Sequence, residues 1–244
     1  MSAAVTFATM RRILAQLRHD HRTLALLIGL PTLLMILLHY VFDQPMLFDR
    51  LGPMLLGLFP FIVMFVVASV ATLRERTGGT LERLMTMPLG KLDLLLGYAL
   101  AFGLLALAQV GIVLVISLTW LGLDLNGSLG SLVLVSLLDA LLGMSLGLFA
   151  SAFARTEFQA VQFMPAFVLP QMLLCGLFIP RDDMASWLTA ISDVLPLSYA
   201  VEGMQEISVR TDFTGTLAVD VAVIAAFAVV SLVLGAVTLR RRTA

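Results

Sequence analysis

Six long apolar segments constrain the fold of this chain more than any other feature. A helix needs about 20 predominantly apolar residues to cross the hydrocarbon core of a bilayer. The 244 residues are 60% hydrophobic and 13% charged, against about 45–50% apolar and roughly 25% charged in soluble domains. The pattern therefore predicts an all-α integral membrane protein with six transmembrane helices. The segments run Leu24–Phe42, Leu51–Leu73, Leu94–Leu118, Leu129–Phe153, Val161–Ile179 and Leu217–Leu239.

The charge and cysteine content exclude several classes of protein. The formal net charge is -1, so the chain lacks the basic surface that a nucleic-acid partner requires. Its one cysteine excludes an internal disulfide framework and a multi-cysteine metal cluster. We therefore expect no nucleic acid and no bound metal, and we expect the lipid bilayer as the main surrounding.

The distribution of Lys and Arg predicts the orientation of the helices, because cytoplasmic flanks and short loops are enriched in these residues. Of the 15 such residues, 12 fall before the first segment, between the second and third, between the fourth and fifth, or after the sixth. The other side has only Arg50, Arg181 and Arg210. Both termini are therefore expected in the cytoplasm, in agreement with an even number of spans.

The stretch before the first span, residues 1–23, has the pattern of an amphipathic helix. Phe7, Met10, Leu14 and Leu17 recur at helical spacing, and Ile13 widens this apolar stripe. Arginines occupy much of the remaining surface. Such a helix is expected to lie in the inner membrane interface. The alternative is a positively charged flank that only fixes the topology.

The cytoplasmic loop 74–91 contains a second short helical pattern. Gly78-Gly79 breaks the preceding helix, Thr80 is suited to cap a new one, and Pro88 ends it. Within that turn, apolar residues at i, i+3 and i+4 share one face. A short helix in water has no core of its own in which to bury such a ridge, so a partner protein is expected to cover it. The alternative is a ridge that rests on the membrane surface. The ridge consists of Leu81, Leu84 and Met85.

The outer segment 180–216 is mainly acidic among its charged residues and also contains apolar residues and the amphipathic aromatics Trp187 and Tyr199. Such aromatics suit the level of the lipid headgroups. We therefore expect short re-entrant helices between spans five and six.

Asp139 is the one acidic residue deep in a predicted span. An ionisable group there costs at least about 2.5–3.5 kcal/mol on insertion scales, so it is expected to face protein or water. Gly143 and Gly147 follow on the same stripe and allow close approach of another helix. Asp139 is therefore either a functional residue, as a polar contact in a translocation path or a coupling point, or a protonated or hydrogen-bonded packing residue. The packing interpretation is favoured.

The fifth predicted span contains Pro165 and Pro170. Proline removes a backbone donor and clashes with the preceding turn, so a kink or break is expected. Methionine and aromatic residues near it suit adaptable apolar binding, although packing against lipid or a neighbouring helix is the simpler explanation. With Asp139, the candidate translocation path comprises Gln162, Phe163, Met164, Phe167 and Met172.

Two stretches carry a family resemblance. The loop Glu75–Pro88 reads Glu-Arg-Thr-Gly-Gly-Thr-Leu-Glu-Arg-Leu-Met-Thr-Met-Pro, and it resembles the second-to-third-span loop of type-2 ATP-binding-cassette (ABC) exporter permeases. Gly176–Pro180 and Leu195–Gly203, the latter reading Leu-Pro-Leu-Ser-Tyr-Ala-Val-Glu-Gly, are similar to the outer signature of the daunorubicin-resistance-like branch. The resemblance covers nearly the whole chain and implies one transmembrane permease domain over residues 1–244. Glu202 and Gln205 depart from the usual residues of that branch.

The resemblance also implies a division of labour. Two permeases, either identical copies or sister chains, enclose the path, and two cytosolic ABC ATPase subunits bind ATP and magnesium beneath them. This chain has no phosphate-binding loop of its own, because Gly90-Lys91 is followed by Leu92 in place of Ser or Thr. We therefore expect no cofactor on this chain and no ATPase activity in it. The short helix would be the coupling helix that inserts into the ATPase. The residues assigned to this coupling are Glu75, Gly79, Thr80, Leu81, Glu82, Arg83, Leu84, Met85 and Pro88.

The function expected from these features is export of a hydrophobic or amphipathic compound, such as a drug or antibiotic, across a bacterial inner membrane. The runner-up within the family is export of a polysaccharide or lipid-linked glycan. Outside the family, an ATP-independent transporter would show inverted halves with paired broken helices. An intramembrane hydrolase would need a catalytic constellation, and the sequence contains no His-Glu-x-x-His and no Gly-x-Ser-x-Gly.

Overall fold

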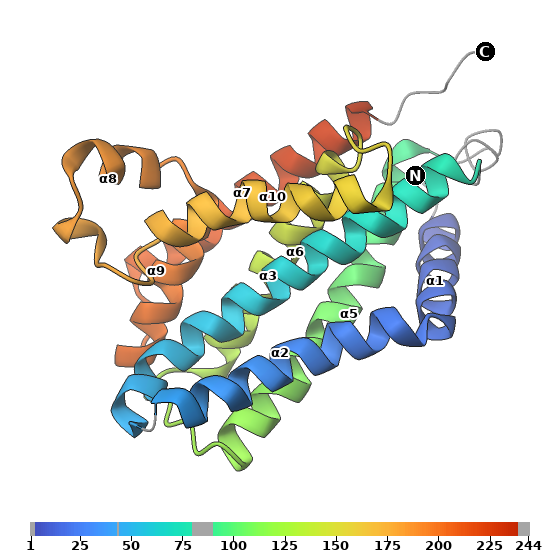
Figure 1. Cartoon of the computed structure of the whole chain (residues 1–244). Coiled ribbons are helices and arrows are strands. Elements are labelled where there is room, and N and C mark those ends of the chain that lie inside the picture. The colour runs from blue at the N-terminus through green and yellow to red at the C-terminus, as the bar shows by residue number, and fades with distance from the viewer. Residues whose placement is uncertain (1–2, 43, 80–89, 239–244) are drawn as a thin grey trace.

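A computed structural model describes residues 3–42, 44–79 and 90–238, and over these ranges the chain is helical with no β-strand (Figure 1). Long helices run side by side, with the central α3 flanked by the others. The helix α1 lies at one end of the bundle, and α8 and α9 lie at the opposite end. The elements are α1 (Ala3–His19), α2 (His21–Phe42), α3 (Pro45–Thr77), α5 (Lys91–Thr119), α6 (Leu129–Ala150), α7 (Glu157–Leu174), the 3-10 turn η1 (Arg181–Asp183), α8 (Ser186–Ser192), α9 (Pro196–Val209) and α10 (Gly215–Thr238).

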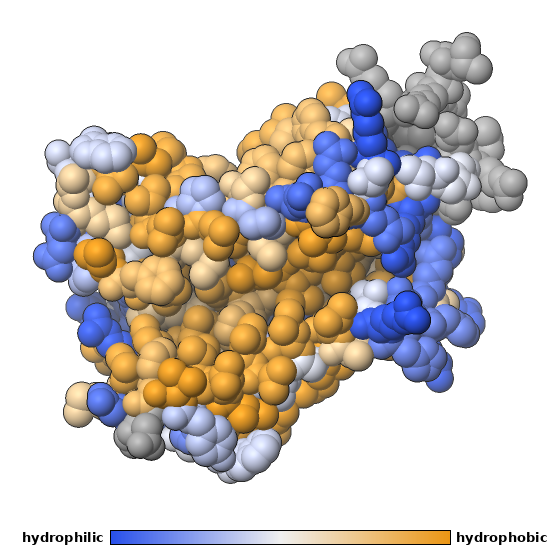
Figure 2. Space-filling model, viewed as in Figure 1, coloured by the Kyte–Doolittle hydropathy of each residue, from blue (hydrophilic) through white to orange (hydrophobic). Residues whose placement is uncertain are grey.

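Five of these helices, α2, α3, α5, α6 and α10, are long and apolar enough to cross a membrane. They coincide with five of the six predicted spans, and α3 is longer than its predicted span at both ends. The surface is apolar around the middle of the bundle and hydrophilic at its ends (Figure 2), as a bilayer requires. An integral membrane protein is therefore confirmed at the level of helix length and composition.

The fifth predicted span differs from the structure. The helix α7 has 18 residues and ends at Leu174, so the predicted boundary at Ile179 is wrong, and α7 does not meet the length and apolarity of the other five. The chain turns at Gly176, whose φ of 89° is open mainly to glycine. The count of six spans therefore stays a prediction.

The prolines of α7 do not break it, contrary to one expected outcome. The helix is continuous from Glu157 to Leu174 with Pro165 and Pro170 inside it. A missing backbone N–H can be tolerated in an apolar helix when neighbouring helices and local adjustments satisfy the carbonyl that proline frees. The helix α3 likewise runs on through Pro53 and Pro60.

The contact between α3 and α6 is close and depends on two glycines. A Cβ atom on Gly143 would lie 2.2 Å from the carbonyl oxygen of Phe61, and one on Gly147 would lie 2.2 Å from that of Phe65. Backbone therefore packs directly on backbone, as the stripe of small residues indicated. The position of Asp139, one turn earlier on α6, is fixed by this contact.

The helix expected before the first span is present, but it is a separate helix that meets α2 at a corner. Asp20 forms this corner by accepting hydrogen bonds from the backbone N–H (3.1 Å) and hydroxyl (2.7 Å) of Thr23, which caps α2. Only part of the predicted apolar stripe of α1 is buried against the bundle, because Leu17 is buried whereas Phe7 is 58% exposed. Because α1 lies close to Gly97 of α5, only small side chains of α1 fit at this contact. The buried residues of α1 are Thr6, Thr9, Ile13 and Leu17.

The outer segment forms the short helices that its sequence predicted, namely η1, α8 and α9. Its interior is held by polar contacts. The Ser192 hydroxyl lies 2.8 Å from the carbonyl oxygen of Leu174 and 2.9 Å from the Ser198 hydroxyl. The Arg181 guanidinium donates to Glu202 at 2.6 Å and pairs with Asp193. These contacts fold the segment back over the end of α7. Whether it enters the membrane stays a prediction.

Candidate functional site

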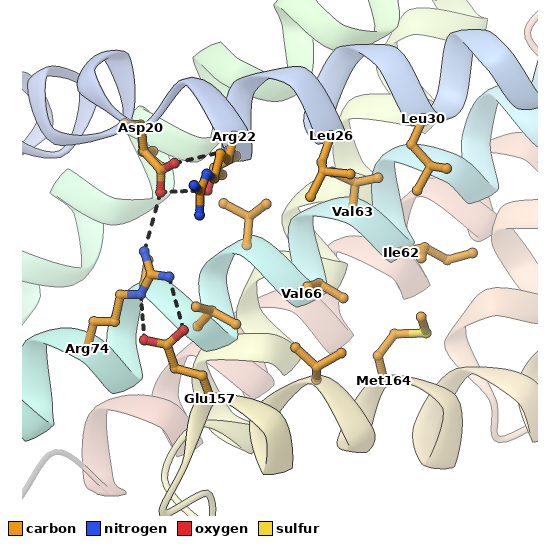
Figure 3. A pocket seen from close by; sticks show the side chains of 16 residues that line it. Asp20, Arg22, Leu26, Leu30, Ile62, Val63, Val66, Arg74, Glu157 and Met164 are labelled. Atoms are coloured by element: carbon orange, nitrogen blue, oxygen red, sulfur yellow. Dashed lines mark hydrogen bonds and ion pairs between the residues drawn. The ribbon is translucent and has the colours of Figure 1, made fainter.

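Three charged side chains from three separate parts of the chain meet beside the N-terminal end of α7. Arg74 of α3 donates two hydrogen bonds to the Glu157 carboxylate, from Nε at 2.8 Å and from Nη2 at 3.0 Å. Its third nitrogen, Nη1, lies 3.3 Å from Oδ2 of Asp20 at the α1–α2 corner. Figure 3 shows this ion cluster of Asp20, Arg74 and Glu157 at one end of a pocket. It connects α2, α3 and α7 at the end of the bundle from which α3 leads into the loop 74–91.

The ion cluster is built so that both carboxyl groups stay ionised. Hydrogen bonds from Thr23, with a smaller contribution from Arg74, lower the pKa of Asp20 below its ordinary value. The hydrogen bonds from Arg74 lower the pKa of Glu157. The side chain of Glu157 is 53% exposed and that of Asp20 is 31% exposed, so each pair contributes little stability on its own. The bidentate geometry instead fixes how α3 and α7 are oriented relative to each other.

A second ion cluster lies one residue further along α3. Glu75 is buried and accepts a hydrogen bond from Arg12 of α1 at 2.8 Å and another from the hydroxyl of Tyr98 on α5. Burial alone would lower the pKa of Arg12, but the hydrogen bond and charge of Glu75 outweigh it and raise that pKa. Glu75 therefore ties α1, α3 and α5 together immediately before the chain turns at Gly79.

We expect the Glu75→Ala substitution to destabilise the inner end of the bundle by about 3 kcal/mol, at the low end of the range for breaking a buried pair. The reason is that Arg12, whose side chain is 26% exposed, and Tyr98 would lose their common acceptor. Glu75→Gln keeps one acceptor oxygen and should cost less. Thermal unfolding of the purified protein in one detergent measures this, and equal melting temperatures for Glu75→Ala and wild type would contradict it.

A pocket of about 400 Å³ lies between α2 and α7, with α3 as its floor, and we call it the α2–α7 groove. Figure 2 shows this face of the molecule as apolar surface hollowed between the two helices. The ion cluster and Arg22 form its charged end, and aliphatic side chains form the rest (Figure 3). An apolar volume of this size with a few convergent polar groups is typical of a ligand site. The apolar lining includes Leu26, Leu30, Ile62, Val63, Val66 and Met164.

The groove contains one residue of the predicted translocation path. Met164 lines it, whereas Phe163, Phe167 and Met172 do not, and Gln162 is exposed elsewhere on α7. Phe167 packs near Phe65 of α3, with ring centroids 6.3 Å apart. Among the predicted path residues, Met164 is therefore the one that the α2–α7 groove contains.

Asp139 lies away from the groove and is completely buried. Neither of its carboxyl oxygens has a hydrogen-bond partner within the residues that the structure describes. Gly143 and Gly147 on the same stripe are in backbone contact with α3. This placement favours a packing position over a lining position.

Replacing Asp139 with asparagine is expected to leave transport within about twofold of wild type, because asparagine keeps the shape of the side chain and removes the cost of burying an ionisable group. Substrate transport by the reconstituted complex measures this. A normally folded Asp139→Asn protein that no longer transports would instead place Asp139 in the path.

The predicted coupling residues are only partly within the described ranges. Glu75 and Gly79 are described: Glu75 forms the second ion cluster, and Gly79, with φ of 70°, follows the end of α3. The predicted break at Gly78-Gly79 is confirmed, since α3 ends at Thr77. The other coupling residues, Thr80, Leu81, Glu82, Arg83, Leu84, Met85 and Pro88, lie outside the described residues.

Sequence reasoning named Glu75 but missed its partners Arg12 and Tyr98. It also missed the ion cluster of Asp20, Arg74 and Glu157. Asp20 and Glu157 each carry a local signal, because Asp20 caps α2 through Thr23, and Glu157 follows Thr156, which accepts from the backbone N–H of Gln159 and caps α7. Those signals mark helix starts and not a shared partner. Tyr98 has no local signal at all.

Over residues 3–42, 44–79 and 90–238, no group of three or more His, Cys, Asp or Glu side chains is arranged to hold a metal ion.

Comparison with known proteins identifies the family. A model of the ABC-2 type transporter family matches residues 4–209. The chain is 28% identical over 186 residues to the probable multidrug ABC transporter permease YbhS of Escherichia coli, covering 74% of this chain and 49% of that protein. It is 29% identical over 186 residues to the linearmycin resistance permease protein LnrN of Bacillus subtilis, covering 74% of this chain and 47% of that protein.

A third relative is ABC transporter G family member 20 of Dictyostelium discoideum, 26% identical over 162 residues, which are 66% of this chain and 22% of that protein. The chain thus spans about half the length, or less, of these relatives. The family match nevertheless covers most of the chain and includes α1, the span helices up to α7 and the outer helices. The all-helical bundle and the family match together establish that this chain is an ABC-2 type transporter permease.

Proposed function

We propose that this chain exports a hydrophobic or amphipathic compound, such as a drug or antibiotic, across a bacterial inner membrane. Separate cytosolic ABC ATPase subunits, which bind ATP and magnesium, supply the energy, and a second permease, identical or sister, completes the path. Both termini face the cytoplasm. The names of the bacterial relatives, as multidrug and linearmycin resistance permeases, support this class of cargo.

The observation that carries the proposal is the α2–α7 groove. It combines aliphatic walls with a charged end, which matches a molecule with an apolar body and a polar group. The groove is open at the surface of the bundle, so a compound dissolved in the membrane reaches it without passing through water. The walls offer few hydrogen-bonding groups of the kind that an oligosaccharide requires, which favours the drug-like cargo.

Coupling follows from the connections of α3. Arg74 and Glu75 tie the inner end of α3 to α1, α2, α5 and α7, and the loop that follows carries the ridge Leu81, Leu84 and Met85. A displacement of that loop by the ATPase is transmitted along α3 as a rigid element and alters the charged end of the groove.

Reconstitution of the permease with its cognate ABC ATPase in proteoliposomes tests the proposal. Hydrophobic and amphipathic drugs should stimulate ATP hydrolysis and be transported, whereas soluble sugars should do neither. Met164→Trp, which fills the groove from α7, should weaken drug stimulation. The matched control is Leu169→Trp on the same helix, at an exposed side chain that does not line the groove. Stimulation by glycan carriers alone would overturn the drug assignment.

A further inference from the structure

The two arginines at the charged end of the α2–α7 groove differ in whether they have an acidic partner. Arg74 has both of its acidic neighbours, Asp20 and Glu157, as partners. Arg22 lines the same end, is exposed, and makes no ion pair with any residue in the described ranges. The Arg22 guanidinium therefore has no ion-pair partner in the described ranges, and it lies beside an ion cluster whose charges are paired with one another.

The surroundings of Arg22 strengthen the preference for a negative charge. Arg18, at the end of α1, is exposed and also has no ion pair in the described part of the chain. Both arginines lie at the α1–α2 corner, at the level where α1 meets the first span. Cations at the surface of a membrane attract anionic lipids, and arginine forms bidentate hydrogen bonds with phosphate.

The apolar part of the groove extends from this charged end along α2 and α3. Leu26 and Leu30 form one wall, and Ile62 and Val66 form the floor. Leu26 and Leu30 stay 62% and 43% exposed, so the groove is open sideways to the bilayer. A hydrocarbon chain lying along it would cover these side chains while remaining connected to a head group at Arg22.

We propose that the α2–α7 groove is a binding site for an anionic phospholipid of the inner leaflet, with the phosphate on Arg22 and one acyl chain along Leu26, Leu30 and Val66. This inference rests on the orientation given under the proposed function, which places the α1–α2 corner on the cytoplasmic side. It does not depend on the identity of the exported compound or on ATP hydrolysis. A bound lipid of this kind occupies the groove when no compound is being exported.

Native mass spectrometry of the full-length protein, released from mixed micelles containing equal amounts of phosphatidylglycerol and phosphatidylcholine with the same acyl chains, tests this site. Wild type should retain phosphatidylglycerol over phosphatidylcholine by about fivefold, the effect expected of one cation at a membrane surface. Arg22→Gln should abolish the preference. Arg11→Gln removes an exposed cation of α1 that does not line the groove, so it should retain the preference.

Two substitutions on α2, a test and its control, examine the apolar half of the site. Leu30→Trp, which fills the groove, should reduce retention of both lipids, whereas Leu33→Trp alters an exposed leucine outside it and should not. Equal lipid retention by Arg22→Gln and wild type, or equal losses in Arg22→Gln and Arg11→Gln, would overturn the proposal. Loss of a protein dimer in Leu30→Trp with unchanged lipid retention would also overturn it, since the groove would then be an interface between copies.

Drug-stimulated hydrolysis is measured in a separate experiment. A failure of the lipid proposal therefore leaves the export proposal standing.

Discussion

Gly143→Leu is expected to abolish the folded bundle, and Gly143→Ala to weaken it severely. A Cβ at this position would lie 2.2 Å from the carbonyl oxygen of Phe61 and 2.9 Å from its Cα. Overpacking a core costs about 1–3 kcal/mol when side chains can give way, and here the neighbour is helix backbone, which cannot turn aside. The clash is removed only if α6 moves away from α3. The same contact also positions Asp139.

The matched control for Gly143→Ala is Gly111→Ala, in the interior of α5. A Cβ at Gly111 meets no atom within 4 Å, and alanine is the better helix former. Gly111→Ala should therefore be neutral or slightly stabilising. The yield of monodisperse protein and its melting temperature in detergent measure both variants. If Gly143→Ala purified in normal yield with a wild-type melting temperature, the direct contact between α3 and α6 would be wrong.

The helices of this protein could be predicted because apolar length is a local property of the sequence. The five helices that are long and apolar enough to cross a membrane follow from runs of about 20 apolar residues. Helix ends were less predictable, since α7 stops at Leu174 where Gly176 turns the chain. The side of α1 that packs on the bundle was only partly predictable for a related reason. Close approach to Gly97 favours Thr9 over Phe7, and a pattern of hydrophobicity does not encode that approach.

The candidate site was less predictable because it depends on contacts between distant segments. Arg74 is 83 residues from Glu157 and 54 from Asp20, and nothing in their local sequence indicates a shared partner. The predicted path residues on α7 point to several sides of that helix, so hydrophobicity alone did not select Met164 from among them. By contrast, Gly143 and Gly147 were predictable, because the spacing of small residues on one helix face is itself the signal for close packing.

Leu84→Asp is expected to prevent the permease from holding its ATPase, so that co-purification and drug-stimulated hydrolysis fall to background. Leu81, Leu84 and Met85 are spaced to share one face of a short helix. A carboxylate in the middle of that face would be buried without a partner on docking, which costs several kcal/mol. Such a cost exceeds what the rest of a small docking surface can offset. The membrane bundle itself should stay folded, because Leu84 belongs to the loop that follows the end of α3 at Thr77.

Thr86→Asp provides the matched control, since it adds the same charge to the same loop at a position that helical spacing places away from the ridge. It should retain the ATPase. Melting temperatures of the isolated permease distinguish lost docking from misfolding, and both variants should match wild type. If Leu84→Asp keeps the ATPase, or if Thr86→Asp loses it equally, the ridge is not the docking surface. The connection from Arg74 and Glu75 to the motor must then run through another part of the inner face.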